Sequence, residues 1–293
     1  MSHKLFTLVA KESFGEEEVK NFCKNNFDLS IKDSKVLAEN AIQLTISKYD
    51  SIKSPDIEEK LNIKKVDFCV QEETDTQFKV LLCDMDATII ANETLDDLVK
   101  LTGVKTNIDE TSKLAMEGKI DLKTTLKNRV ELLKGHPKSL IEEVKNGISF
   151  NPGGDIMVRT LNSHGLISNL VTGGFEPIST YVGEKLGFHN IISNQFVFDK
   201  NNRFTGEYHL VNGEKNSKYK FMEKLSEEKN LDFSEMVSIG DGSNDLEMLK
   251  NSGLGIGYYA HDIVKKSILT QIKFTDLKTI LFFLGIKESE FSK

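Results

Sequence analysis

Hydrophobic and polar positions follow two different patterns, which change near residue 77. Before that point, apolar residues alternate with polar ones, as over 42–46, or recur at helical spacing. After it, short runs such as 78–83 are apolar at nearly every position. Alternation is typical of a strand with one buried face, and a continuous apolar run is typical of a strand buried on both faces. We therefore predict two domains, residues 1–76 and 77–293.

The N-terminal pattern predicts a small α+β domain. Apolar alternation or strand-length apolar runs indicate strands at Lys4–Ala10, around 42–46 and at Val66–Val70. Helical spacing indicates helices over Gly15–Asn26 and from Ile57–Leu61 onward. The order strand, helix, strand, helix, strand is that of many small ligand-binding or docking domains.

Three later apolar runs predict the core of a parallel sheet. Residues 78–83, 166–171 and 236–239 each end in polar, often glycine-rich residues, and helical sequence follows. Strands that alternate with helices form a doubly wound, Rossmann-like α/β fold. In such open sheets, ligands bind at the carboxyl ends of the strands. We therefore expect the polar residues at these three strand ends to converge on one site.

The segment between the first two of these runs, about residues 93–150, contains no convincing strand. Leu95, Leu98 and Val99 have helical spacing, and so do apolar positions over 122–133. A helical insertion above the carboxyl edge of a sheet acts as a lid over the site beneath it. We predict a small helical cap here.

Charge and composition exclude several classes of function. The formal net charge is −7, and nothing in the sequence builds a broad basic face, so we expect no nucleic-acid partner and no membrane-surface role. No run approaches the roughly 20 apolar residues of a membrane span, and the N-terminus lacks a secretory-signal pattern. Three cysteines without paired spacing suit buried positions and a reducing compartment. We therefore expect a cytoplasmic protein.

The first candidate site is the pair Asp84 and Asp86, directly after the first apolar run. Carboxylates two positions apart at a strand end point in the same direction. Two such acids beside an apolar strand are costly unless a cation or a proton resolves their repulsion. Mg²⁺ suits this role, because it binds one or two carboxylates together with phosphate oxygens.

Three further features follow along the chain. Asp241 lies between two glycines that allow a tight turn. Thr172 and Gly173 offer a hydroxyl and exposed backbone N–H groups to a phosphate, and Lys218 offers a cation. Each feature by itself is weak, because such turns and surface lysines are common. Together, and in this order, they predict a site for a metal ion and a phosphate group.

The whole set resembles the haloacid dehalogenase-like superfamily, and within it the phosphoserine phosphatase family, over about residues 79–285. The resemblance implies a doubly wound α/β core with a small helical cap, which agrees with the strand pattern. It also implies hydrolysis of O-phosphoserine to serine and phosphate, in serine biosynthesis. Beyond the generic motifs, the matching segments are Asn92–Thr94, Ala115–Lys119, Lys127–Leu133, Val171–Phe175 and Gly240–Asp245.

Matching positions give the catalytic roles that the resemblance implies. Asp84 would be the nucleophile that forms a phospho-aspartyl intermediate, and Asp86 would serve first as the acid and then as the base. Asp84, the backbone carbonyl of Asp86 and Asp241 would bind Mg²⁺. Asn244 and Asp245 would support this centre.

The resemblance also implies a substrate site shared between core and cap. Glu93 would meet the substrate ammonium and Arg129 its carboxylate, a pair that favours a zwitterionic substrate over a sugar phosphate. By themselves, the two residues would be better explained as a first-turn acid and a surface cation of helices, and the catalytic motifs around them favour the functional interpretation. The residues assigned to the substrate are Glu93, Met116, Arg129, Thr172, Gly173, Lys218 and Asn244.

Three positions depart from the family pattern. Ala87 replaces the commoner serine of the first motif, and Thr172 keeps a hydroxyl where serine is more usual. Leu122 stands where the family often has an aromatic side chain. The last difference would loosen the fit to serine.

Other functions remain open at this stage. A related phosphatase or phosphotransferase could act on another small amino-acid-like phosphomonoester, because an alcohol can intercept the aspartyl phosphate in place of water. A non-catalytic binding protein is a further alternative, against which the intact acids and Lys218 argue. Residues 1–76 resemble the regulatory ACT-type domains of some bacterial phosphoserine phosphatases, which leaves a homodimer open.

Overall fold

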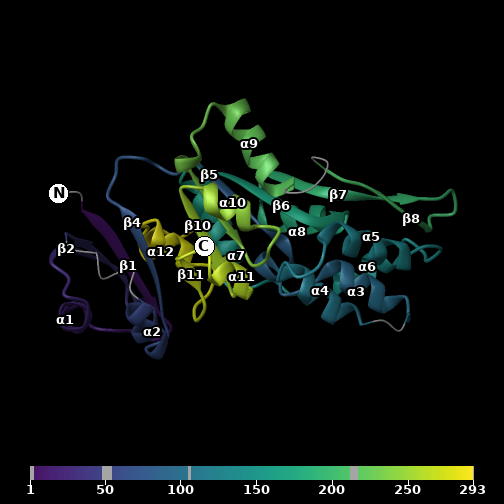
Figure 1. The fold of residues 1–293 in the computed structure, drawn as a ribbon. Coiled ribbons are helices and arrows are strands. Elements are labelled where there is room, and N and C mark those ends of the chain that lie inside the picture. The colour runs from purple at the N-terminus through teal and green to yellow at the C-terminus, as the bar shows by residue number, and fades with distance from the viewer. Residues whose placement is uncertain (1–2, 48–54, 105–106, 212–216, 293) are drawn as a thin grey trace. The chain divides into compact units, whose positions relative to one another are not determined.

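Two compact units make up the chain, which is drawn in Figure 1. The computed structural model describes residues 3–47, 55–104, 107–211 and 217–292. The first unit consists of Met1–Gln77, Pro152–His164 and Leu269–Lys293, and the second of Phe78–Asn151 and Gly165–Ile268. The N-terminal residues therefore pack with two segments that lie far along the sequence. That residues 1–76 form a domain of their own stays a prediction.

The first unit is built on an antiparallel sheet. Its strands are β1 (Lys4–Ala10), β2 (Ile31–Ala38), β3 (Ala41–Ile46), β4 (Val66–Glu72) and β11 (Gln271–Ile272). Its helices are α1 (Glu16–Phe27), α2 (Pro55–Ile63), α7 (Gly154–Ser163) and α12 (Thr279–Phe283), with a short turn of helix at Glu288–Glu290. The strand order is β2-β3-β1-β4-β11, and each neighbouring pair is antiparallel.

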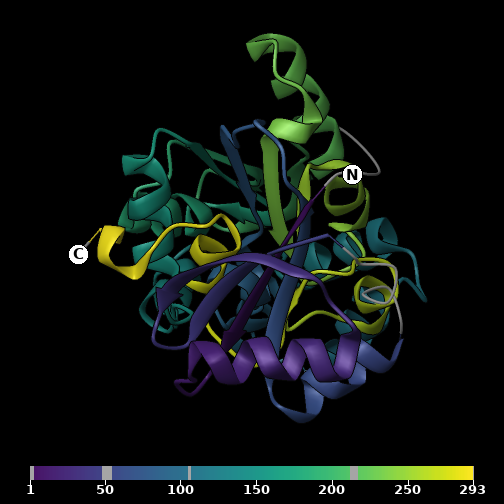
Figure 2. The same ribbon diagram turned by 90° about the vertical axis from the view of Figure 1, so that its left-hand side faces the viewer.

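Helix α1 lies across one face of this sheet (Figure 2). Val19, Cys23 and Phe27 recur at helical spacing along α1 and belong to one buried cluster with Phe6 and Leu44 of the strands. The spacing of apolar residues thus sets which side of the helix faces the sheet. Burial raises the pKa of the Cys23 thiol to about 12. All three cysteines are free and buried, as the sequence predicts.

The sequence pattern does not predict strand β2, and the expected order of N-terminal elements is therefore wrong by one strand. β2 stands at the end of the sheet order, and its residues Asp33, Lys35 and Val36 are exposed, whereas Leu37 is buried. An edge strand is held by hydrogen bonds to one neighbour and needs little core contact. A run in which only half of the residues are apolar can consequently form it without an alternating pattern.

Hydrogen bonds join the C-terminal segment to the antiparallel sheet. Gln71 Nε2 donates to the carbonyl oxygen of Phe283 at 2.7 Å. The buried Asp67 carboxylate accepts the backbone N–H groups of Lys273, Phe274 and Thr275. A buried carboxylate is stable when N–H donors satisfy it. These contacts explain why the C-terminal residues belong to the same unit as the N-terminal strands.

The second unit has a mainly parallel sheet. Its strands are β5 (Val80–Cys83), β6 (Ile167–Glu176), β7 (Asn190–Phe198), β8 (Phe204–His209), β9 (Met236–Gly240) and β10 (Leu254–Tyr258). Its helices are α3 (Thr94–Leu101), α4 (Ile108–Met116), α5 (Leu122–Leu132), α6 (Leu140–Asn146), α8 (Ile178–Leu186), α9 (Ser217–Lys229), α10 (Leu246–Asn251) and α11 (Asp262–Lys265), with short turns at Met85–Ile89 and Phe233–Glu235. The order is β10-β9-β5-β6-β7-β8, parallel except for β8.

Helices pack on both faces of this parallel sheet. Met222 and Leu225 of α9 share a buried cluster with Val80 and Val171 of the strands. Successive side chains of a strand point to opposite faces. Leu170, the neighbour of Val171, accordingly lies against α8 on the other face. The doubly wound α/β class predicted from the apolar runs is confirmed.

The helical cap predicted for about residues 93–150 consists of α3, α4, α5 and α6, which group together beside the hairpin of β7 and β8 (Figure 1). Backbone hydrogen bonds tie the cap to this hairpin. The N–H of Gly135 donates to Phe204 O at 2.8 Å, and the N–H of Phe204 donates to His136 O at 3.0 Å. The C-terminal part of the cap is therefore anchored on the extended end of the sheet.

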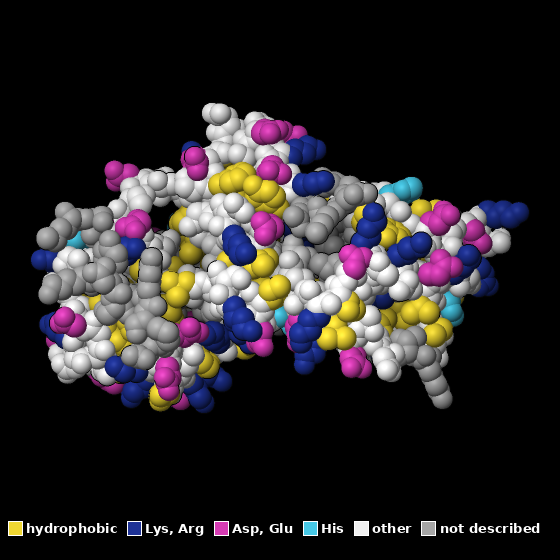
Figure 3. Space-filling view, viewed as in Figure 1, with side chains coloured by type: hydrophobic (Ala, Val, Ile, Leu, Met, Phe, Trp, Pro, Cys, Tyr) yellow, Lys and Arg dark blue, Asp and Glu magenta, His cyan; other side chains and the backbone are white. Residues whose placement is uncertain are grey.

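Charges of both signs are distributed over the surface. Lys and Arg side chains lie interspersed with Asp and Glu side chains on the face drawn in Figure 3. In the part of the chain that the structure describes, no helix combines the length and the apolar character needed to cross a bilayer.

Gly255 provides a test of the packing beneath the site. A Cβ atom at this position of β10 would lie 2.0 Å from the carbonyl oxygen of Leu249, which is backbone of α10 and cannot move aside cheaply. We expect Gly255→Ala to lower the free energy of unfolding by about 1–3 kcal/mol, as for other overpacked sites. Thermal unfolding of the full chain measures this change.

Gly147→Ala is the matched control. Its φ is −91°, and the nearest atom to an added Cβ is Val144 O at 3.5 Å, an ordinary contact. Alanine also restricts the unfolded chain, so this variant should be neutral or slightly stabilised. Equal unfolding temperatures for the two variants would contradict the packing described for β10 and α10.

Candidate active site

Three adjacent parallel strands bring the predicted residues to one edge of the sheet. Cys83 at the end of β5 is in register with Ile239 of β9 on one side and with Leu170 of β6 on the other. Asp84 follows β5 directly, and Asp241 follows β9 directly. This placement is the convergence of strand ends that the apolar runs predict.

Asp84 begins the turn that leaves β5. Its backbone N–H continues the sheet by donating to Ile239 O at 3.0 Å, and its carboxylate accepts the N–H of Met85 at 2.7 Å. The side chain is buried. Burial and the charge of Asp245 raise the pKa of Asp84, whereas the charge of Lys218 opposes this rise.

A buried ammonium group links two of the acids. Lys218 of α9 is 2% exposed, and its Nζ lies 2.5 Å from Asp84 Oδ1 and 2.6 Å from Asp245 Oδ1. Burial by itself would lower the pKa of Lys218, but the charges of Asp245 and Asp84 raise it above the ordinary value. The lysine is therefore a fixed cation beside the Asp84 carboxylate.

One oxygen atom from each of Asp84, Asp241 and Asp245 lies within 4.8 Å of the others, and all three residues are buried. Three carboxylates against one lysine leave excess negative charge in the cluster. Burial, followed by the charges of Asp84 and Asp245, raises the pKa of Asp241 well above its usual range. Oxygen donors in this number and charge suit a hard divalent cation.

The turn after β9 is shaped to present these acids. The Asp245 carboxylate accepts the N–H groups of Asp241 at 3.2 Å and Gly242 at 3.1 Å. A Cβ atom at Gly240 would lie 2.2 Å from Asp245 Cγ, so this position requires glycine. Asn244 Oδ1 is buried and has no hydrogen-bond partner among the described residues, which leaves one more oxygen for a cation or a substrate.

Asp86 is separate from the acid cluster. Its Oδ1 accepts the N–H of Thr94 at 2.9 Å, at the start of the cap. Burial raises the pKa of Asp86 to about 6, although the hydrogen bond from Thr94 opposes the rise. The Asp86 side chain is therefore suited to proton transfer. The proposed role of its backbone carbonyl as a metal ligand stays a prediction.

Thr172 and Gly173 lie within β6 and not after it, so the expected strand end at Val171 is wrong. The strand continues to Glu176, but its pairing with β7 shifts between Val171 and Phe175. The Thr172 hydroxyl accepts the N–H of Gly174 at 2.8 Å. The pairing with β7 is therefore interrupted at Thr172 and Gly173, the residues that the sequence predicts to bind a phosphate.

Gly174 lies where any side chain would crowd Asp86 and Thr172. A Cβ atom there would lie 3.0 Å from Asp86 Oδ2 and 3.1 Å from Thr172 Oγ1. The two polar side chains therefore converge on the same small region. Gly173 itself is exposed, and its carbonyl oxygen accepts Asn194 Nδ2 at 2.8 Å.

The cap contacts the turn after β9 through the C-terminal end of α4. Ser243 donates twice to the last residues of this helix, from its N–H to Met116 O at 3.0 Å and from Oγ to Ala115 O at 3.0 Å. Met116, which the sequence assigns to the substrate site, thus lies directly above the turn that holds Asp241 and Asp245.

Glu93 lies at the entrance to α3, in the electrostatic field of the other acids. Burial, followed by the charges of Asp86 and Asp96, raises its pKa to about 8, and Arg129 opposes this rise. The Asp84 charge acts in the same direction as those of the other acids. Glu93 is therefore close to the catalytic carboxylates and unfavourably charged until a cation approaches.

Arg129 is buried inside the cap and not at its surface. Its Nε lies 3.3 Å from Asp96 Oδ1, and its Nη2 donates to the hydroxyl of Ser112. Sequence reasoning does not single out Asp96 or Ser112. Asp96 stands in the first turn of a helix, where an acid is common for its own sake, and Ser112 matches no motif.

His261 is another neighbour that the sequence does not indicate. Its N–H donates to Asp241 O at 2.8 Å, and its Nε2 lies 3.6 Å from Asp241 Oδ2. The two residues are far apart in sequence, and an isolated histidine gives no pattern that would relate it to Asp241.

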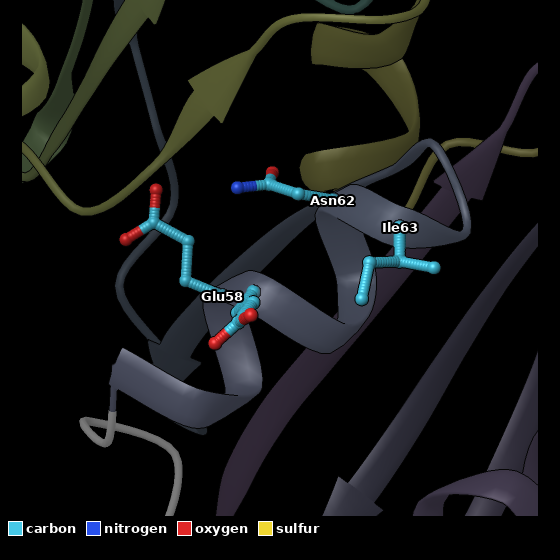
Figure 4. Close-up of a pocket in the computed structure, with 4 residues that line it drawn as sticks. Glu58, Asn62 and Ile63 are labelled. Atoms are coloured by element: carbon cyan, nitrogen blue, oxygen red, sulfur yellow. The ribbon is translucent and has the colours of Figure 1, made fainter.

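The first unit has a depression of about 470 Å³ along α2 (Figure 4). Glu58, Glu59, Asn62 and Ile63 line it, and Glu58 forms an ion pair with Lys273. None of the site residues expected from the sequence lines this depression.

Comparisons with known proteins agree with this geometry. The family model described as haloacid dehalogenase-like hydrolase matches residues 81–250. A phosphoserine phosphatase of Methanocaldococcus jannaschii is 32% identical over 209 residues, which cover 70% of this chain and 97% of that protein. A phosphoserine phosphatase of Haemophilus influenzae is 31% identical over 278 residues, covering 93% and 85%.

A solved structure has the same architecture. It is described as a phospho-aspartyl intermediate analogue of phosphoserine phosphatase, is 31% identical, and superposes with a TM-score of 0.67 over 72% of this chain and all of the other. The family model spans more than half of the residues and includes Asp84, Thr172 and Asp241. The chain therefore belongs to the haloacid dehalogenase-like hydrolases.

Proposed function

We propose that this protein is a phosphoserine phosphatase, which hydrolyses O-phosphoserine to serine and phosphate through a phosphorylated Asp84. One observation carries the proposal: a buried carboxylate at the end of β5 is held against the Lys218 ammonium inside an acid cluster. The phosphoserine phosphatases that are 31–32% identical to the chain support the choice of substrate. The reaction belongs to serine biosynthesis.

Asp84 is the nucleophile in this mechanism. A carboxylate oxygen attacks phosphorus in line with the serine oxygen, so that an acyl phosphate bond forms as the bond from phosphorus to serine breaks. Lys218, 2.5 Å from Asp84 Oδ1, lies where it can stabilise negative charge on the transferred group. Thr172 and Gly173 support the phosphate from the neighbouring strand.

Asp86 moves the protons in both steps. In its acid form it protonates the departing serine oxygen. In its base form it then takes a proton from the water that attacks the phospho-aspartate, which releases phosphate and restores Asp84. The pKa of about 6 places Asp86 between these two forms near neutral pH. The hydrogen bond from Thr94 fixes its direction.

The acid cluster fits Mg²⁺. Its excess negative charge and the buried, unpartnered Asn244 Oδ1 are both satisfied by a small divalent cation with oxygen ligands. Asp84 and Asp241 would hold the ion together with the Asp86 carbonyl, and Asp245 orients the turn. When bound, the ion neutralises charge that develops on the phosphoryl group. Asn244 can also contact the substrate phosphate.

The cap supplies the choice of substrate. Glu93 meets the ammonium of phosphoserine and Arg129 its carboxylate, with Met116 packed beside them. The raised pKa of Glu93 reflects burial and the acids around it, and the substrate ammonium would offset both.

We further propose a cytoplasmic location, and a homodimer in which the N-terminal residues serve as an ACT-like regulatory region.

Asp84→Asn should abolish turnover of phosphoserine, by about 10³-fold or more, because the isosteric amide is not nucleophilic. Acid-quenched wild-type protein should carry label from radioactive substrate, and the variant should carry none. Asp155→Asn, which changes an exposed aspartate in the first unit, is the control and should keep full activity. Turnover of more than a few per cent in Asp84→Asn would rule out the covalent mechanism.

Activity should require Mg²⁺, and Ca²⁺ should inhibit. Mg²⁺ demands a compact octahedral site, whereas the larger Ca²⁺ accepts bidentate carboxylates and would occupy the second oxygen of Asp84. Binding can be measured without turnover, because a ligand of the folded state raises the unfolding temperature. Mg²⁺ should raise it in the wild type but not in Asp241→Asn. Full activity in Ca²⁺ alone would contradict the assignment.

Arg129→Ala and Glu93→Gln should lose activity toward different sets of substrates. Arg129→Ala should cost phosphoserine about 2–4 kcal/mol in kcat/KM, because the carboxylate loses its fork of donors. Phosphoethanolamine has no carboxylate and should be a poor substrate that the variant barely worsens. Glu93→Gln should impair phosphoserine and phosphoethanolamine alike and leave an aryl phosphate almost unchanged. Equal losses on all three substrates in Arg129→Ala would remove the carboxylate assignment.

A further inference from the structure

Three polar residues meet in the interior of the cap, one from each of three helices. Asp96 on α3, Ser112 on α4 and Arg129 on α5 are 2%, 5% and 8% exposed. Arg129 Nε faces Asp96 Oδ1 at 3.3 Å, Arg129 Nη2 donates to Ser112 Oγ, and Ser112 Oγ donates to Asp96 Oδ2. Hydrogen bonds therefore connect Arg129 through Ser112 to Asp96, and an ion pair between Arg129 and Asp96 completes a closed ring of polar contacts.

This ring fixes the plane of the guanidinium group. Arginine is long and rotamer-rich, and fixing it at the moment of binding would cost entropy. Two contacts at different nitrogen atoms, Nε and Nη2, define both the position and the rotation of the planar group. A guanidinium carries five N–H donors in a rigid fork, which is more than these two contacts use and which matches the two oxygens of a carboxylate.

The ring lies at the substrate end of the site. Arg129 and Asp96 both act on the pKa of Glu93, the first lowering it and the second raising it. Glu93 also responds to the charges of Asp84 and Asp86. Arg129 is therefore in the same electrostatic neighbourhood as the nucleophile. Asp96 compensates its charge while no substrate is bound, which makes the buried cation tolerable.

We propose that Asp96 and Ser112 are positioning residues, which hold the Arg129 guanidinium in the orientation that receives the substrate carboxylate. The inference rests on the proposed function and deepens it, because it names residues that set specificity without touching the substrate. Ser112 joins the pair through its hydroxyl, which accepts from Arg129 and donates to Asp96. Removal of either residue leaves the arginine charged but free to rotate, so recognition of carboxylate substrates weakens while phosphate chemistry continues.

The test compares Asp96→Asn and Ser112→Ala with the wild type on phosphoserine, phosphoethanolamine and an aryl phosphate. We expect both variants to raise KM for phosphoserine by about 10-fold or more, since a misplaced positioning group has effects of that order. The kcat for phosphoserine, and kcat/KM for the other two substrates, should change by less than about twofold. Ser112→Thr keeps the hydroxyl and should restore the wild-type KM. Ser139→Ala, at an exposed serine of the cap, is the matched control.

A double-mutant cycle shows whether the effect passes through the arginine. In an Arg129→Ala background, Asp96→Asn should cause no further loss on phosphoserine, because there is no guanidinium left to orient. Additive losses would overturn the inference, and so would equal losses on all three substrates, which a purely structural role produces. If Asp96→Asn does not fold, the comparison of Ser112→Ala with Ser112→Thr decides in the same way.

The inference and the proposed function can fail separately. If Arg129→Ala is selective for phosphoserine but Asp96→Asn and Ser112→Ala leave its KM unchanged, the positioning role is overturned and the substrate assignment stands. If Arg129→Ala impairs all three substrates equally, both the carboxylate assignment and the positioning role are overturned.

Discussion

The burial of three carboxylates at one edge of a parallel sheet costs free energy that the ammonium of Lys218 offsets only in part. Lys218 lies against Asp84 and Asp245, and Asp245 in turn fixes the turn that carries Asp241. Lys218 therefore holds Asp84 and Asp245 in place, and Asp245 holds the backbone of Asp241. The remaining negative charge favours a divalent cation with oxygen ligands. The chemistry of the site follows from this imbalance.

The cap is joined to the rest of the second unit in two places. Backbone hydrogen bonds between Gly135, His136 and Phe204 tie its C-terminal part to the β7–β8 hairpin. The C-terminal end of α4, which includes Met116, meets the turn after β9 through the two hydrogen bonds of Ser243. The closed ring of Asp96, Ser112 and Arg129 connects three cap helices with one another. These contacts hold the cap helices together and join them to the hairpin and to the turn after β9.

Most of the sheet and the order of the site follow from local sequence pattern. Apolar runs locate β5, β6 and β9, because a strand covered on both faces can hold few polar residues. The apolar runs do not locate strand β2, since an edge strand can contain many polar residues. The extension of β6 past Val171 is not located by the apolar pattern either, because Gly-Gly has low strand propensity and only pairing with β7 beyond the interruption defines the strand.

The sequence by itself determined the kind of chemistry. Acids and glycines that follow apolar runs, together with a lysine, predict a site for a metal ion and a phosphate group. Only the tertiary structure decided that Arg129 has two partners inside the cap, and that residues 152–164 and 269–293 pack with the N-terminal strands. The physical reason is the same in each case. These contacts join residues that are far apart along the chain, and their distances depend on how helices and strands pack, which local pattern does not encode.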